Sequence, residues 1–151
     1  MTDSYSNGVG ARRPTPIHLW IVAVLALLWN LMGVFDYLAT QLELDFYMSQ
    51  FSEDQLAYFY GFPKWVVAGW AFGVWGALVG SIGLLMRRKW SVWAFAVSLA
   101  GMVISSVYTI LLSDGATMMG AGGVAFSVVI WIVAIFLLWY SWSQSEKGVL
   151  V

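Results

Sequence analysis

Cysteine is absent from this chain, and histidine, proline and charged residues are scarce. Without cysteine there is no disulfide, no thiol nucleophile and no thiolate metal site. One histidine and a charged content of 10% leave little material for another metal centre or for an acid–base pair. No phosphate-binding loop, nucleophile elbow or basic nucleic-acid patch is present. We therefore expect no metal, no cofactor, no nucleic-acid partner and no enzymatic activity.

Apolar surface is what the chain has in excess. Of its 151 residues, 61% are hydrophobic and 17% are aromatic, including ten tryptophans. A soluble domain of this size has too little interior to bury that much apolar surface, whereas a helix of about 20 apolar residues crosses a bilayer. The sequence predicts an all-α membrane protein with spans at about residues 17–39, 64–86, 90–112 and 124–143. A flexible tail (1–16) precedes them and a short tail (144–151) follows.

The second predicted span carries glycine at a regular interval. These residues are three or four positions apart, which places them on one side of a helix: Gly69, Gly73, Gly76, Gly80 and Gly83. Glycine is a poor helix former, and in membranes small residues allow two helix backbones to approach closely. Gly33 and Gly101 occupy similar small-residue positions in the first and third spans. We expect an antiparallel four-helix bundle with crossing angles of about +20°.

The connection between the first two spans contains the signature of a short helix. Ser52 and Gln55 form a capping-box pattern, and Gly61 and Pro63 end the segment. The segment is too short to cross a membrane and is rich in tyrosine and phenylalanine. We therefore predict an interfacial helix on the outer side of the membrane.

The distribution of charge predicts the orientation. Six of the seven basic residues fall on one side of a four-span topology: Arg12, Arg13, Arg87, Arg88, Lys89 and Lys147. The other side has only Lys64, together with most of the acidic residues. The positive-inside rule places both termini in the cytoplasm of a bacterial cell, with the spans in its inner membrane.

Two polar residues within the first span are candidate solute or ion sites. Asn30 falls near mid-membrane, where it either contacts a solute in a central cavity or forms a helix–helix hydrogen bond. Asp36 lies about one turn from the outer end of that span. It is either a proton or cation site, or an interfacial group that reaches water or pairs with Lys64.

Three tryptophans fall near the depth of Asn30: Trp29, Trp75 and Trp131. Together they would form an aromatic box that stacks on a flat, sugar-like solute. The structural alternative is that they are core or lipid-facing aromatics, which is the more common role of such residues.

Three segments carry a resemblance to a known family: residues 29–41 (WNLMGVFDYLATQ), 62–65 (FPKW) and 113–115 (SDG). The chain resembles, over nearly its whole length, a family of small bacterial inner-membrane proteins with four predicted spans. Members of that family are often called sugar transporters. The resemblance implies a four-span fold and transport of a small solute, and it assigns no individual residue.

Two functions follow as hypotheses. The first is a small-solute transporter or permease component. The second is a non-transporting accessory or scaffold subunit of a membrane complex, in which the glycines serve packing alone. Besides the lipid bilayer, a parallel homo-oligomer or a larger complex is the expected partner, since the charge bias opposes insertion in two orientations. A water-accessible cavity that reaches Asn30 would favour transport.

Overall fold

The computed structural model describes residues 14–151, and every regular element in that range is helical. The order is α1 (Ile17–Gln41), α2 (Asp45–Met48), α3 (Glu53–Tyr60), α4 (Lys64–Leu85), α5 (Trp90–Val107), a π-helical segment (Tyr108–Leu112) and α6 (Gly115–Glu146). Four of these stretches are long and apolar enough to cross a membrane, so the prediction of an all-helical chain with four such helices is confirmed. Most of the predicted N-terminal tail, with Arg12 and Arg13, lies outside the described residues.

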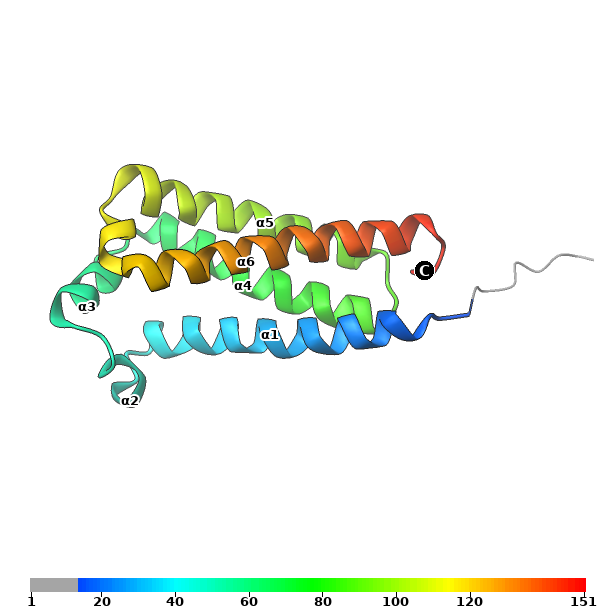
Figure 1. Cartoon of the computed structure of the whole chain (residues 1–151), viewed down its shortest axis with the longest axis horizontal. Helices are drawn as coiled ribbons and strands as arrows, with labels where there is room; N and C mark the ends of the chain where they lie inside the picture. The colour runs from blue at the N-terminus through cyan, green and yellow to red at the C-terminus, as the bar shows by residue number, and fades with distance from the viewer. Residues whose placement is uncertain (1–13) are drawn as a thin grey trace, which may run out of the picture.

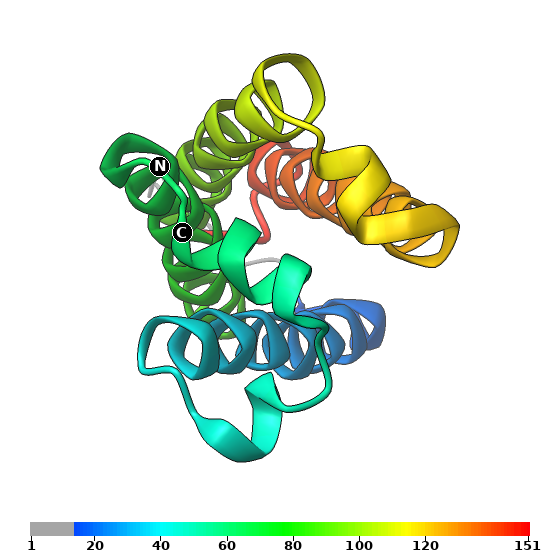
Figure 2. The same ribbon diagram turned by 90° about the vertical axis from the view of Figure 1, so that its left-hand side faces the viewer.

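The four long helices lie side by side and alternate in direction (Figure 1). Each packs mainly on its neighbour in sequence: α1 on α4, α4 on α5, and α5 on α6. The short helices α2 and α3 lie at one end, and the segment after α6 lies at the other. Seen from the α3 end, α1 and α6 stand apart along most of their backbones, with α3 crossing the end of the group (Figure 2).

The closest contact is between α4 and α5, and glycine makes it possible. A methyl group added at Gly76 would lie 3.0 Å from the Ser98 backbone nitrogen, and one at Gly80 would meet the Phe95 ring. The other seam positions, Gly69, Gly73 and Gly83, also face residues of α5. The carbonyl oxygens exposed by this approach accept hydrogen bonds, such as the one that Ser98 Oγ donates to the Gly73 oxygen at 2.5 Å. Small residues thus replace apolar side-chain burial as the reason these helices adhere.

On the face of α4 that adjoins the glycine seam, α4 packs on α1. The buried residues Ala23 and Leu19 of α1 cluster with Leu84 of α4. Gly33 of α1 faces Val74 of α4, at an ordinary contact distance of 3.8 Å for an added methyl group. The α1–α4 contact is therefore looser than the α4–α5 contact.

The loop between α1 and α4 contains two helices, of which the sequence predicted one. The helix α3 begins with the expected capping box: the Gln55 N–H donates to Ser52 Oγ, and the Ser52 N–H donates to Gln55 Oε1. It ends at Gly61 as predicted. The additional helix, α2, is four residues long and has no side-chain cap, so its sequence carries no start signal.

The last helix begins earlier than the sequence predicts. We expected a loop from 113 to 123 and a span from 124, whereas α6 begins at Gly115. The backbone breaks inside it at Gly120, whose φ of 65° and ψ of −179° suit glycine alone. The residues before the break form a separate helical turn over the end of the group. Three glycines within four positions resemble a loop in sequence, but only Gly120 has non-helical angles.

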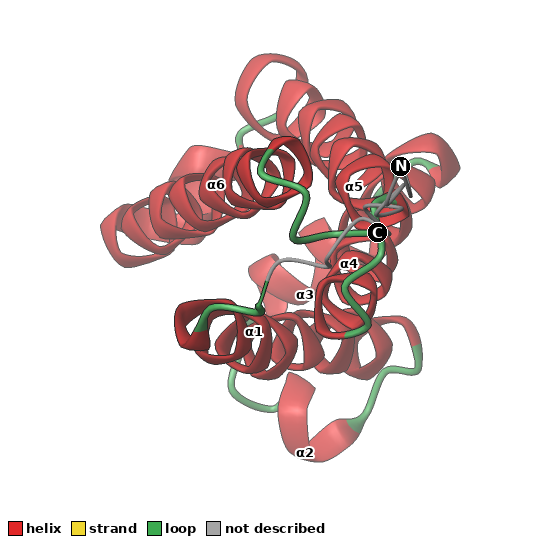
Figure 3. Cartoon of the chain, turned by 90° about the vertical axis from the view of Figure 1, so that its right-hand side faces the viewer, coloured by secondary structure: helices red, strands yellow, loops and turns green. Residues whose placement is uncertain are grey.

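The segment after α6 folds back onto the other helices (Figure 3). Leu150 is fully buried with Leu19 and Leu84, and Tyr140 lies in the same cluster. The Val151 N–H donates to the Arg87 oxygen at 2.7 Å, and the Lys89 N–H donates to the Val151 oxygen at 3.1 Å. The short tail expected here is thus joined to the turn between α4 and α5.

Candidate functional site

Asn30 lies at the contact between α1 and α4. Its Nδ2 donates to Ser81 Oγ at 2.8 Å and to the Ala77 oxygen at 3.3 Å, and Ser81 Oγ donates to the same carbonyl at 2.9 Å. Asn30 is 9% exposed and Ser81 is fully buried. An unpaired buried amide is costly, so this network explains how a polar residue is tolerated between two apolar helices. Of the two interpretations of Asn30, the geometry matches the helix–helix hydrogen bond.

Asp36 is half-buried near the end of α1, where it joins α1 to α2. The Tyr47 hydroxyl donates to Asp36 Oδ1 at 2.5 Å. The Tyr47 ring packs edge-on against Phe35 and Phe51, which places the phenol over this end of α1. The sequence suggested Lys64 as the partner of Asp36, and the partner in the structure is Tyr47.

Burial raises the pKa of the Tyr47 phenol strongly, and its hydrogen bond to Asp36 and the carboxylate charge raise it further. All three effects act in the same direction, because ionised tyrosine would be poorly hydrated, would lose its hydrogen bond to Asp36 and would face a second anion. Tyr47 therefore stays protonated and remains a hydrogen-bond donor to Asp36 over the physiological range of pH. The contact functions as a stable link between α1 and α2.

The three tryptophans proposed as an aromatic box lie on three helices. Trp29 is half-buried on α1 and packs on Phe126 of α6, with ring centroids 5.9 Å apart. Trp75 on α4 is 41% exposed, and Trp131 on α6 is half-buried. No ring pair in the described part of the chain joins any two of the three tryptophans. Their placement matches that of packing or lipid-facing aromatics.

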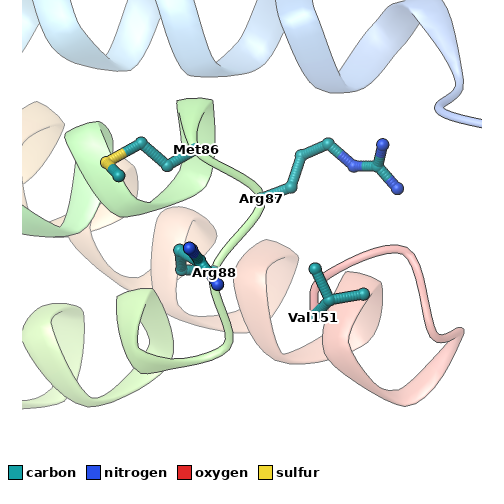
Figure 4. Close-up of a pocket in the computed structure, with 4 residues that line it drawn as sticks. All are labelled: Met86, Arg87, Arg88 and Val151. Carbon is teal, nitrogen blue, oxygen red and sulfur yellow. The ribbon is translucent and has the colours of Figure 1, made fainter.

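Two surface hollows lie at opposite ends of the molecule. One, of about 390 Å³, is lined by Met86, Arg87, Arg88 and Val151 (Figure 4). The other, of about 270 Å³, lies beside α2 and α3 and is lined by Glu43, Asp45, Met48, Ser49, Leu56 and Tyr60. Neither hollow is lined by Asn30, Asp36 or the three tryptophans. Within residues 14–151, no three histidine or acidic side chains are grouped so that they could hold a metal ion.

Sequence reasoning missed several contacts between distant segments. His18 Nδ1 and the Tyr140 hydroxyl are 2.5 Å apart and join α1 to α6. Gln55 Nε2 donates to the Met118 oxygen at 3.0 Å, which attaches α3 to the first turns of α6. Residues so far apart in the chain carry no shared spacing signal, so only the helix arrangement reveals them.

The apolar helices define the class of the molecule as far as the fold allows. Four helices of this length and composition are compatible with a multi-pass integral membrane protein. Comparison of the chain with protein-family models, curated proteins and solved structures gave no match. The resemblance to four-span inner-membrane proteins therefore stays a prediction.

Proposed function

We propose that this chain is a four-span protein of the bacterial inner membrane that acts as a non-transporting accessory or scaffold subunit. The observation that carries the proposal is the hydrogen-bond network in which Asn30 Nδ2 donates to Ser81 Oγ and to the Ala77 carbonyl. A transporter needs a polar group in its spans that a solute can reach. Here the amide nitrogen of Asn30 donates to two groups of α4, and the two hollows described above lie at the ends of the helices.

The proposed orientation places the end that carries the α4–α5 turn in the cytoplasm. Arg87, Arg88 and Lys89 lie at that end, beside the segment after α6 (Figure 1). The opposite end carries α2, α3 and the acidic residues Glu43 and Asp45, and we propose that α3 lies at the outer membrane interface. The excess of cations at one end supports this orientation through the positive-inside rule.

A subunit of this kind requires a partner, which we propose is a parallel second copy or another membrane protein. The last helix supports this proposal, because only 6% of its most apolar stretch is buried within the chain, compared with 33% for α4. Packing rather than apolar burial drives association between helices in lipid, and α6 has the largest face left free for a partner helix among the four long helices.

The absence of cysteine makes the proposal directly testable. Single-cysteine variants Asn30→Cys and Glu43→Cys would be reconstituted in vesicles and treated with a small, water-soluble thiol reagent. We expect Glu43→Cys to react and Asn30→Cys to stay unmodified until the protein is unfolded. Reaction of Asn30→Cys at a rate close to that of Glu43→Cys would demonstrate a water-filled path and overturn the proposal.

An uptake assay tests directly whether the protein transports a solute. Wild-type protein in sealed vesicles should accumulate none of a panel of sugars and monovalent cations above empty vesicles. Uptake that Asp36→Asn abolishes would establish instead the alternative, a small-solute transporter or permease component with Asp36 as its ion site.

A further inference from the structure

We propose that the hollow between the α4–α5 turn and the segment after α6 is a binding site for the phosphate headgroup of an anionic phospholipid. It is lined by two arginines, Arg87 and Arg88, and by two apolar side chains, Met86 and Val151 (Figure 4). A guanidinium donates paired hydrogen bonds to phosphate, so this lining matches a phosphate in both charge and donor chemistry. The inference rests on the membrane placement of the proposed function and does not depend on the accessory role.

The site is held in shape by the segment after α6. Arg87 Nε and Nη2 both donate to the Val149 oxygen, at 3.3 and 3.2 Å, and the Arg87 backbone oxygen accepts from the Val151 N–H. These contacts hold Arg87 at a φ of 57°, a left-handed conformation that is uncommon for a side chain of this size. The backbone conformation is thus fixed before a ligand arrives, which lowers the entropic cost of binding.

The donors that remain free face outward. Within the described residues, no hydrogen-bond partner occupies Nη1 of Arg87 or the side chain of Arg88, and Arg88 is exposed. No aspartate or glutamate side chain lines the hollow, and its one carboxylate is that of Val151, the last residue of the sequence. Glu146 and Lys147, at the end of α6, are both exposed, and neither lines the hollow. The hollow therefore carries two guanidinium charges against one carboxylate, which leaves it a net positive charge.

The apolar side of the hollow favours a lipid over a soluble phosphate. Met86 is 55% exposed and Trp90, which begins α5, is 42% exposed. These side chains belong to the ends of two predicted spans, where tryptophan is common at the membrane boundary. A phospholipid would place its phosphate on the arginines and its acyl chains along Met86. A soluble phosphate would gain nothing from the apolar part.

The experiment compares two variants that each remove one positive charge. Arg88→Gln changes a residue that lines the hollow. Lys89→Gln changes the next residue in the chain, which is also exposed but does not line the hollow. Binding of phosphatidylglycerol to detergent-purified protein would be measured by titration, with phosphatidylcholine as the zwitterionic control. Loss of one cation near an anionic surface weakens binding about fivefold through general attraction alone. We expect about that loss for Lys89→Gln and at least a tenfold loss for Arg88→Gln.

Three results would overturn the proposal. Equal losses in the two variants would show diffuse attraction without a site, and equal binding of the two lipids would remove the role of charge. Full competition by millimolar inorganic phosphate would identify a soluble ligand. A second measurement needs no variant: a phosphatidylglycerol analogue with a photoreactive headgroup should label Met86, Arg87, Arg88 or Val151 in the wild type. Labelling confined to other residues would also contradict the assignment.

Discussion

Alanine substitution should have opposite effects at two glycines of this chain, Gly101 and Gly122. A methyl group at Gly101 would lie 2.5 Å from the Gly69 oxygen and 2.6 Å from the Gly73 nitrogen, both backbone atoms of α4. A methyl group at Gly122, in α6, would have no neighbour within 4 Å. The two substitutions are chemically identical and differ only in what the methyl group meets.

The expected magnitude follows from the separation that Gly101→Ala demands. Comfortable contact begins near 3.5 Å, so α4 and α5 would have to separate by about 1 Å. Overpacking of this kind costs about 1–3 kcal/mol, and the Ser98 hydrogen bond to the Gly73 oxygen, worth about 0.6 kcal/mol, would lengthen as well. Alanine recovers about 1 kcal/mol through its higher helix propensity. We expect a net loss of about 2 kcal/mol for Gly101→Ala and a gain of up to about 1 kcal/mol for Gly122→Ala.

Unfolding by sodium dodecyl sulfate in mild detergent, followed by circular dichroism, measures both variants on one scale. A loss of about 2 kcal/mol corresponds to a fall in melting temperature of about 4–8 °C. If Gly101→Ala is as stable as Gly122→Ala, the close approach of α4 to α5 does not exist and the explanation of the glycine seam is wrong. The Gly101→Ser variant provides a second check, since its larger side chain should lower stability further.

Three further predictions concern the two ends of the molecule. A double-mutant cycle on Asp36→Asn and Tyr47→Phe should show coupling of about 0.5–2 kcal/mol, whereas a cycle on Asp36→Asn and Lys64→Gln should show none. Coupling in the Lys64 cycle and none in the Tyr47 cycle would establish an ion pair between Asp36 and Lys64 instead. Because the Tyr47 pKa is raised on folding, its contribution is complete below its ordinary pKa of 10.0 and is lost as the pH rises through the higher folded value. Wild type should therefore lose more stability than Tyr47→Phe in alkaline titrations above about pH 10, and parallel curves would contradict this. Leu150→Ala should lower the free energy of unfolding by about 2–4 kcal/mol because Leu150 is fully buried. Val151→Ala, at an exposed side chain, should change it by no more than about 0.5 kcal/mol. Equal effects would mean that the segment after α6 does not pack on the other helices.

The long helices were predictable because their signals are local. Apolar stretches of about 20 residues define α1, α4 and α5 from composition alone. The capping box at Ser52 is likewise complete within four residues. In both cases the physical cause of the structure lies within the segment itself.

The start of α6 and the segment after it were not predictable for the opposite reason. The residues from Gly115 to Gly123 are held by α3 through Gln55 and Met118, and by the Tyr58 hydroxyl, which lies 2.8 Å from Ser113 Oγ. The burial of Leu150 depends on residues of α1 and α4. A weak local signal was overridden by tertiary contacts in each case.

The candidate site shows the same division. The sequence placed Asn30 inside a span but left open whether it meets water or another helix. The answer depends on Ser81, whose hydroxyl happens to lie at the same depth on α4. For Asp36, the partner Tyr47 belongs to α2, the helix without a start signal, so the pairing was hidden together with the helix.

The sequence in which the long helices pack on one another has a consequence for biosynthesis. In the proposed membrane placement, each long helix packs on the one before it, so every helix that enters the membrane during translation finds its main partner already there. The exception is the contact between α1 and the last part of the chain, which includes Leu150 with Leu19 and His18 with Tyr140. That contact forms only after α6 has been synthesised, so the nascent chain stays open between its first and last helices until then. Membrane insertases and quality-control proteases would encounter the apolar side of α1 throughout this interval.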